Sequence, residues 1–219
     1  MAVIIPAILE DTVEAFRKRM ATVLKLPDLR KVQVDISDGE FTDRKTVQLV
    51  DIDVLNPMIE WEVHLMVLEP QEYFFEAKLA GFNTIVIHYE AIEDKNKLKI
   101  LAQEIRELKI KPALAIKAET SVEQIQQDIQ FFDQILLLTV NPGFQGQQME
   151  SDILEKLRKL KNASKNVIIE VDGGVKLNNV KELSEAGAEM FVIGSALFDP
   201  GKKSTTPAQN FEEFSRILA

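Results

Sequence analysis

Short runs of Val, Ile and Leu recur along this chain, and each run becomes abruptly polar or glycine-rich after about five residues. Such runs are typical of buried parallel strands that emerge into functional loops. If the strands are parallel, their polar carboxyl ends meet at one edge of the sheet. The expected strands cover residues 3–9, 31–37, 60–67, 84–89, 112–117, 134–140, 167–171 and 190–193.

Segments with helical periodicity separate these runs. They begin near Thr12, Pro70 and Asn96, after Ser121 and after residue 149, and a further one covers 176–186, where Gly187 is the expected stop. A strict alternation of strand and helix repeated eight times favours a closed (β/α)8 TIM barrel over an open doubly wound sheet. The longest irregular stretch is 40–56. We therefore expect residues 1–219 to form a single (β/α)8 barrel domain.

The charge balance narrows the classes of partner. The chain has 35 acidic and 26 basic residues, a net charge of −9, which disfavours nucleic acid and anionic membranes as partners. No apolar run approaches the roughly 18 residues that span a bilayer, and the start MAVIIPAILED has no basic region of a secretory signal. There is no cysteine, so disulfide and thiolate chemistry are excluded. A soluble cytoplasmic protein is expected.

Two aspartates follow the apolar runs and are candidates for proton transfer. Alternation along 31–37 places Gln33, Asp35 and Ser37 on one face, so Asp35 is expected to point into the barrel near its mouth. Asp172, which precedes two glycines, has a similar position on the seventh strand. Either aspartate could instead cap a loop or be solvated at a strand end. If both point inward, they flank one mouth, a geometry suited to two-sided proton transfer at carbon.

The chain has two histidines, and both lie in expected strands. His64 lies between Val63 and Leu65, where it is either a hydrogen-bonded core residue or a ligand. His88 is interpreted as a core residue. A metal site would therefore depend on oxygen donors, here Asp35 and Asp172 together with His64.

Glycine-rich loops follow the last three strands, with NPGFQGQ at 141–147, DGG at 172–174 and GSA at 194–196. Backbone N–H groups in such loops form the phosphate site that is frequent in these barrels. Lys117, at the end of the fifth strand, is either a solvated loop lysine or a Schiff-base nucleophile.

The motifs, in their order and spacing, resemble those of the ribulose-phosphate 3-epimerase family from Ile4 to about Phe198. They are VDISDGEF, EVHLMVLEP, HYEA, TVNPGFQGQ, EVDGGV and VIGSALF. The resemblance implies a phosphate-binding barrel that interconverts D-ribulose 5-phosphate and D-xylulose 5-phosphate with a divalent metal (Zn, Fe, Mn or Co) and two aspartates. It also implies a small-molecule sugar phosphate as substrate and a homo-oligomeric state.

Residue by residue, the resemblance makes Asp35 the proton acceptor and Asp172 the proton donor, both of them also metal ligands, with His64 as a further ligand. It assigns substrate binding, including the phosphate, to a larger set: His64, Gly143, Phe144, Gln145, Gly146, Gly173, Gly174, Gly194 and Ser195.

Several positions depart from the family pattern. Gln33 stands where the family has a histidine ligand, and its amide oxygen is a weaker, neutral donor, so metal binding is expected to be weakened. Ala7 replaces a serine that contacts substrate, Ser37 replaces a methionine, Gln145 replaces a glycine and Lys117 replaces an asparagine.

Three functions remain open from the sequence. The first is a sugar-phosphate 3-epimerase with altered metal preference or substrate. The second is another phosphate-sugar barrel enzyme, either a metal-independent isomerase or a Schiff-base aldolase that uses Lys117. The third is a barrel that binds a phosphorylated ligand without turnover. The related decarboxylases and synthases usually carry D-x-K-x-x-D on the third strand, and EVHLMV lacks it.

Overall fold

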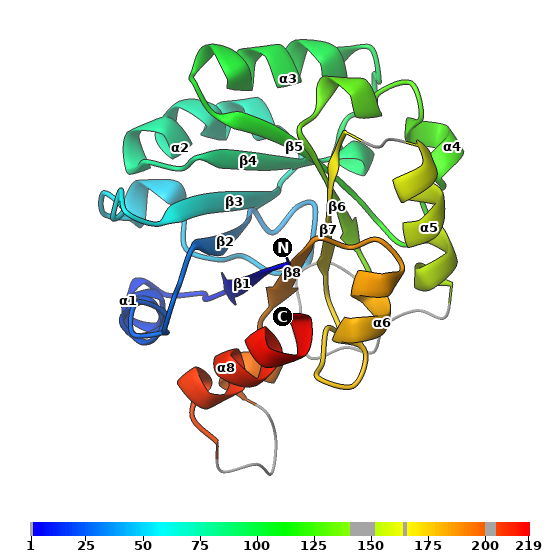
Figure 1. The fold of residues 1–219 in the computed structure, drawn as a ribbon. Helices are drawn as coiled ribbons and strands as arrows, with labels where there is room; N and C mark the ends of the chain where they lie inside the picture. The colour runs from blue at the N-terminus through cyan, green and yellow to red at the C-terminus, as the bar shows by residue number, and fades with distance from the viewer. Residues whose placement is uncertain (1, 141–151, 164–165, 200–204) are drawn as a thin grey trace.

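The structure, a computed structural model, describes residues 2–140, 152–163, 166–199 and 205–219. Within these ranges, eight parallel strands pair in sequence order, and the last pairs back with the first, so the sheet closes into a barrel (Figure 1). The predicted TIM barrel is confirmed, and each strand lies within two residues of its predicted bounds. The strands are β1 (Val3–Ile8), β2 (Lys31–Ser37), β3 (Glu60–Met66), β4 (Thr84–His88), β5 (Lys111–Ile116), β6 (Gln134–Leu138), β7 (Ile168–Asp172) and β8 (Met190–Ile193).

Helices surround the strands on the outside of the barrel (Figure 1). Each predicted helical segment contains one. The helix expected over 176–186 begins later, at Val180, because a turn in which Asn179 Oδ1 accepts from the Lys176 N–H comes first. It ends as predicted before Gly187, whose φ is +118°. The helices are α1 (Val13–Val23), α2 (Phe74–Ala80), α3 (Lys97–Glu107), α4 (Val122–Ile125), α5 (Ile153–Ala163), α6 (Val180–Glu185), α7 (Ser195–Phe198) and α8 (Pro207–Leu218).

The two faces of each strand pack differently. On β2, Val32, Val34 and Ile36 face outward and belong to the large apolar core between sheet and helices. Inside the barrel, apolar side chains form two smaller clusters, one on β4, β5 and β6 and one on β1 and β8. Polar side chains fill the rest of the interior, most of them from β2, β3 and β7, together with His88 of β4 and Gln134 of β6.

A buried group of charged and polar side chains fills the barrel below its mouth. We call Lys31, Glu62, Gln134 and Glu170 the lower cluster. Lys31 Nζ donates to Glu62 Oε2 (2.7 Å), and Gln134 Nε2 donates to one oxygen of each glutamate (2.7 Å to both). Burial raises the pKa of Glu170 well above its usual value, and the Glu62 charge adds to this effect. The lower cluster is therefore a buried polar layer beneath the candidate site, in which one oxygen of each glutamate is hydrogen-bonded and the other has no hydrogen-bond partner among the described residues.

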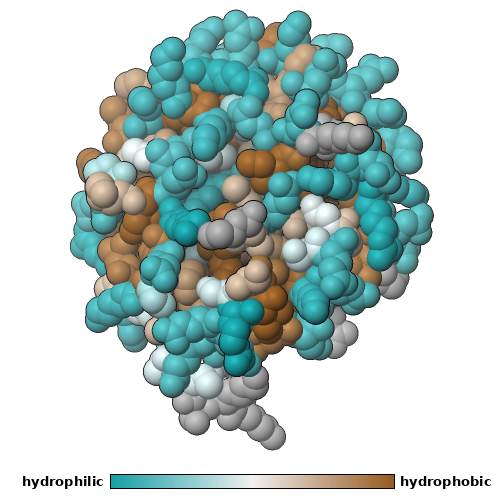
Figure 2. Space-filling view, in the orientation of Figure 1, coloured by the Kyte–Doolittle hydropathy of each residue, from teal (hydrophilic) through white to brown (hydrophobic). Residues whose placement is uncertain are grey.

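Hydrophilic side chains cover most of the face in Figure 2, and hydrophobic residues appear between them. Among the described helices, none combines the length and apolar character needed to cross a membrane.

Candidate active site

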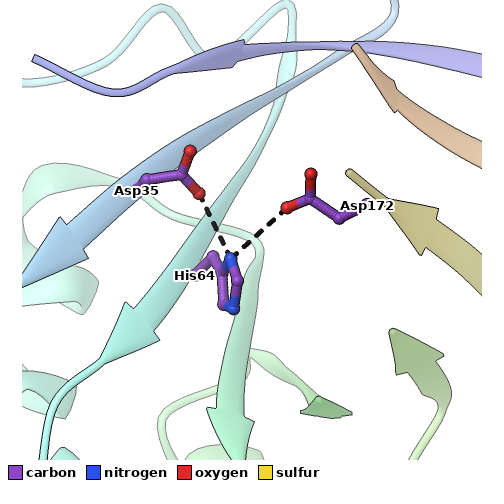
Figure 3. Close-up of side chains that lie close together, drawn as sticks. All are labelled: Asp35, His64 and Asp172. Atoms are coloured by element: carbon purple, nitrogen blue, oxygen red, sulfur yellow. Dashed lines mark hydrogen bonds and ion pairs between the residues drawn. The ribbon is translucent and has the colours of Figure 1, made fainter. Parts of the chain in front are cut away.

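Two aspartates and a histidine meet at the mouth of the barrel (Figure 3). Asp35 on β2 and His64 on β3 are partners in the parallel ladder, so their side chains leave adjacent strands at the same level. His64 Nδ1 lies 3.2 Å from Asp35 Oδ1 and 3.6 Å from Asp172 Oδ2, which comes from the end of β7. The structure thus brings together the three side chains that the sequence places at one mouth.

Burial and charge set the protonation of this group. Burial disfavours the charged imidazole, but hydrogen bonds to Asp172 and Asp35 outweigh it and raise the pKa of His64 to about 9. Burial also raises the pKa of Asp35, and the nearby Asp172 charge acts in the same direction. A carboxylate with a raised pKa is a stronger base than an ordinary one, which suits it to abstract a proton from carbon.

Gln33 lies below the two aspartates and bridges them. Its Nε2 donates to Asp35 Oδ1 (2.7 Å) and to Asp172 Oδ2 (2.9 Å). Its Oε1 is buried and has no hydrogen-bond partner among the described residues. Half a turn of the amide would exchange the two atoms and direct the oxygen at the aspartates.

The donor set fits a divalent metal ion. Asp35, His64 and Asp172 each offer one ligand atom, and these atoms lie within 4.8 Å of one another. Two carboxylate oxygens and one imidazole nitrogen suit the divalent transition metals. The oxygen of Gln33 is available as a fourth donor after the half turn, and as a neutral amide it is the weakest of the four.

His88 connects the site to β4. Its Nε2 lies 2.8 Å from His64 Nε2, and its Nδ1 lies 3.3 Å from Glu90 Oε2. His88 is fully buried, and burial lowers its pKa to about 4. The interpretation of His88 as a buried, hydrogen-bonded residue agrees with this placement, but sequence reasoning missed its contact with His64. The His-x-Glu spacing at the strand end was a signal for the contact of His88 with Glu90 only.

A comparison with known protein families identifies the chain. The family model described as ribulose-phosphate 3 epimerase family matches residues 3–198. The chain belongs to the ribulose-phosphate 3-epimerase family. It is 34% identical over 174 residues to a ribulose-phosphate 3-epimerase of Synechocystis (77% of this chain, 75% of the relative). It is 32% identical over 174 residues to one of Bacillus subtilis (76% and 79%).

Solved structures share the fold. The 3-hexulose-6-phosphate synthase of Salmonella typhimurium superposes with a TM-score of 0.72 at 17% identity, covering 100% of this chain and 98% of that one. At this identity the likeness concerns the barrel alone. Because the epimerase family covers nearly the whole chain, the resemblance inferred from the motifs is confirmed.

The loops that the sequence predicts to bind phosphate lie partly within the described residues. Gly173 and Gly174 follow β7, while Gly194 and Ser195 follow the neighbouring strand β8, so the four residues share one edge of the barrel. Gly173 has a φ of +102°, and a Cβ there would lie 2.5 Å from Val140 Cγ2. The remaining loop residues of the prediction, which are Gly143, Phe144, Gln145 and Gly146, lie outside the described residues.

The other departures from the epimerase family pattern have clear positions. Ala7 is the ladder partner of Gln33 and packs with the interior apolar residues of β1 and β8. Ser37 is fully buried, and its hydroxyl donates to the carbonyl of Arg44 (2.6 Å), so it holds the irregular loop after β2. Lys117 Nζ lies over the ring of Phe41, 4.8 Å from its centroid, in a cation–π contact.

Proposed function

We propose that this chain catalyses the 3-epimerisation of D-ribulose 5-phosphate and D-xylulose 5-phosphate. Membership of the ribulose-phosphate 3-epimerase family supports the reaction. The observation that carries the assignment of residues is the convergence of Asp35 and Asp172, from β2 and β7, on the same nitrogen of His64 (Figure 3). Inversion at a carbon needs one group to take the proton and another to return it from the opposite face, and two carboxylates on different strands meet that need.

The two aspartates then have distinct roles. Asp35 removes the C3 proton of ribulose 5-phosphate, and the electron pair of the C–H bond passes into an enediolate across C2 and C3. Asp172 returns a proton to the other face of C3, which gives xylulose 5-phosphate. Burial raises the pKa of Asp35, which strengthens it as the base. In the reverse direction the roles exchange.

The negative charge of the enediolate must be balanced. Asp35, His64, Asp172 and Gln33 are the residues that would hold a divalent cation, which would supply positive charge to offset the negative charge of the enediolate. We propose zinc, iron, manganese or cobalt, bound more weakly than by a site in which a histidine replaces Gln33. Elemental analysis of the purified protein tests this, because a stoichiometric metal is expected.

We assign the phosphate to the edge formed by the loops after β7 and β8. Gly173, Gly174, Gly194 and Ser195 offer backbone N–H groups there, and residues 143–146 complete the proposed set. The alternative reactions have less support. A Schiff-base aldolase needs a lysine amine directed at the substrate carbonyl, whereas the Nζ of Lys117 lies over the ring of Phe41. Neither a metal-independent isomerase nor binding without turnover is favoured by the family match.

Proton exchange in deuterium oxide tests the function. The metal-loaded enzyme should incorporate deuterium at C3 of ribulose 5-phosphate and form xylulose 5-phosphate. Asp35→Asn and Asp172→Asn should each reduce epimer formation by about 10²- to 10⁴-fold. Asp133 is exposed and lies just before β6, at the opposite end of the barrel from the aspartates. Asp133→Asn is therefore the matched control and should retain activity. Wild-type enzyme that exchanges no C3 proton would contradict the proposal.

We further propose that residues 1–219 work as one domain in the cytoplasm, as a homo-oligomer without nucleic-acid or membrane partners. The net charge of −9 supports the absence of nucleic acid. Val50, Val54 and Met58, which are 77%, 82% and 87% exposed, all lie in the segment 50–58 and support self-association, because exposed apolar residues that gather in one region mark interaction surfaces. Light scattering tests this, and a monomer at micromolar concentration would contradict it.

A further inference from the structure

A line of hydrogen bonds leads from the candidate metal site to the end of β5. His64 Nε2 meets His88 Nε2 at 2.8 Å, and His88 Nδ1 meets Glu90 Oε2 at 3.3 Å. The other oxygen of Glu90 accepts from the backbone N–H of Lys117 (2.8 Å) and from the hydroxyl of Thr120. Both imidazoles are at most 1% exposed, so water does not compete with these contacts.

The two imidazoles meet edge to edge. Their Nε2 atoms are 2.8 Å apart while their ring centroids are 4.9 Å apart, and the ring planes differ by 26°. Ring N–H bonds and lone pairs lie in the ring plane, so this geometry is a hydrogen bond between the rings. One of the two Nε2 atoms carries the proton, and the other accepts it.

The direction of this bond decides whether His64 can bind a metal. A ligand nitrogen needs a free lone pair, and Nδ1 of His64 is the atom that faces Asp35 and Asp172. The His64 proton must then be on Nε2, so His88 must accept at its own Nε2. The remaining proton of His88 is then on Nδ1. The carboxylate of Glu90 is the group that accepts the hydrogen bond from it.

We propose that Glu90 is a positioning residue that acts through His88 to fix the tautomer of His64, leaving Nδ1 of His64 free as a ligand. The proposal rests on the proposed function for the use of the metal. Carboxylates in this position behind ligand histidines orient the ring and increase its basicity. Here the carboxylate acts through a second imidazole, so the series of hydrogen bonds from the carboxylate to the ligand histidine contains one more residue.

An amide cannot replace the carboxylate in this position. Both oxygens of Glu90 accept, one from His88 and one from the Lys117 N–H. A glutamine has one acceptor, and its NH2 group must face one of these two donors. If the NH2 faces His88, then His88 becomes protonated at Nε2, donates to His64, and forces the His64 proton onto Nδ1. The ligand lone pair is then lost.

Nitrogen NMR of the imidazoles tests the proposal, because His64 and His88 are the only histidines in the chain. In the zinc-loaded protein labelled with ¹⁵N-histidine, we expect His88 protonated at Nδ1 and His64 protonated at Nε2. Glu90→Gln should shift both rings towards the opposite tautomers and weaken zinc affinity by about 10- to 100-fold. A wild-type His88 protonated at Nε2 would overturn the proposal without any variant.

The matched control removes a different contact of the same carboxylate. Thr120→Val deletes the hydroxyl that donates to Glu90 but leaves the contact between Glu90 and His88. It should keep the wild-type tautomers and zinc affinity near the wild-type value. Equal losses in Glu90→Gln and Thr120→Val would indicate a purely structural role and contradict positioning. Neither readout requires turnover, so an enzyme without epimerase activity would still give a clear result.

Discussion

Gln33 donates its side-chain NH2 group to Asp172 across the barrel mouth over 2.9 Å, and the same nitrogen reaches Asp35 at 2.7 Å. The amide therefore stands between the two carboxylates where a cation would also be held. Its hydrogens partly offset the repulsion of the two negative groups, so metal binding has to displace them. This competition is specific to glutamine at this position.

Replacing Gln33 with histidine should strengthen metal binding. An imidazole nitrogen is a better donor than an amide oxygen for transition metals, and it leaves no NH2 group to displace. We expect the zinc affinity of Gln33→His to rise by at least about tenfold, which corresponds to about 1.4 kcal/mol. Isothermal titration calorimetry against a competing chelator measures it. Gln33→Leu is the control, and equal affinities in the two variants would refute the expectation.

The stability of the protein should depend on the ionisation of Glu90. Burial opposes its charge, but the hydrogen bonds from His88 and Thr120 outweigh burial and lower its pKa to about 2 from 4.5. A lowered carboxyl pKa stabilises the folded state above the unfolded pKa, and this contribution is lost as pH falls from about 4.5 towards 2. The contribution is at most about 3 kcal/mol.

Urea unfolding of the wild type and Glu90→Gln across about pH 6 to pH 3 measures this term. The difference in free energy of unfolding between them should be largest near pH 6 and should shrink on acidification. A difference that stays constant over this range would show that Glu90 is not held ionised by its neighbours.

Gly173→Ala should damage the loop after β7 through a steric clash. The added Cβ would lie 2.5 Å from Val140 Cγ2 and 3.2 Å from Thr139 Oγ1, at a φ of +102°. Gly81 is a matched control because its φ of +97° is similar while its nearest neighbours lie at 4.0 Å. Gly81→Ala should cost about 1 kcal/mol of stability, and Gly173→Ala about 1–3 kcal/mol more. Thermal and urea unfolding compare them, and equal costs would contradict the clash.

The lower cluster should be sensitive to the loss of its cation. Lys31 is 3% exposed, and Lys31→Met leaves Glu62 buried without its ion-pair partner. We expect a loss of about 3–5 kcal/mol in free energy of unfolding at neutral pH. The double variant Lys31→Met with Glu62→Gln should recover part of this loss, because it removes the unpaired charge. A double variant no more stable than Lys31→Met would show that packing, and not charge, is responsible.

Much of the barrel could be predicted from local sequence patterns, because a buried parallel strand needs a continuous apolar run and a helix needs its own period. The inward direction of Asp35 followed from alternation alone. The contact between His64 and His88 could not be predicted in this way, because it depends on how far β4 is staggered against β3. The charged residues of the lower cluster were predictable from alternation. It places Lys31, Glu62 and Glu170 on the same inward faces as Gln33, His64 and Asp172. The sequence also contained a helix-start signal for α8, at Thr206, Pro207 and Gln209.

Asp35 and His64 are ladder partners, and Gln33 lies two residues before Asp35 on the same strand. The hydrogen bonds between β2 and β3 therefore fix the relative positions of three of the four proposed metal ligands. Of the four, only Asp172 comes from a strand that is not part of this pair, β7. A small change in the cross-section of the barrel therefore alters chiefly how far Asp172 stands from the other three. Substitutions far from the mouth that widen or narrow the barrel should consequently tune ion selectivity without changing any ligand.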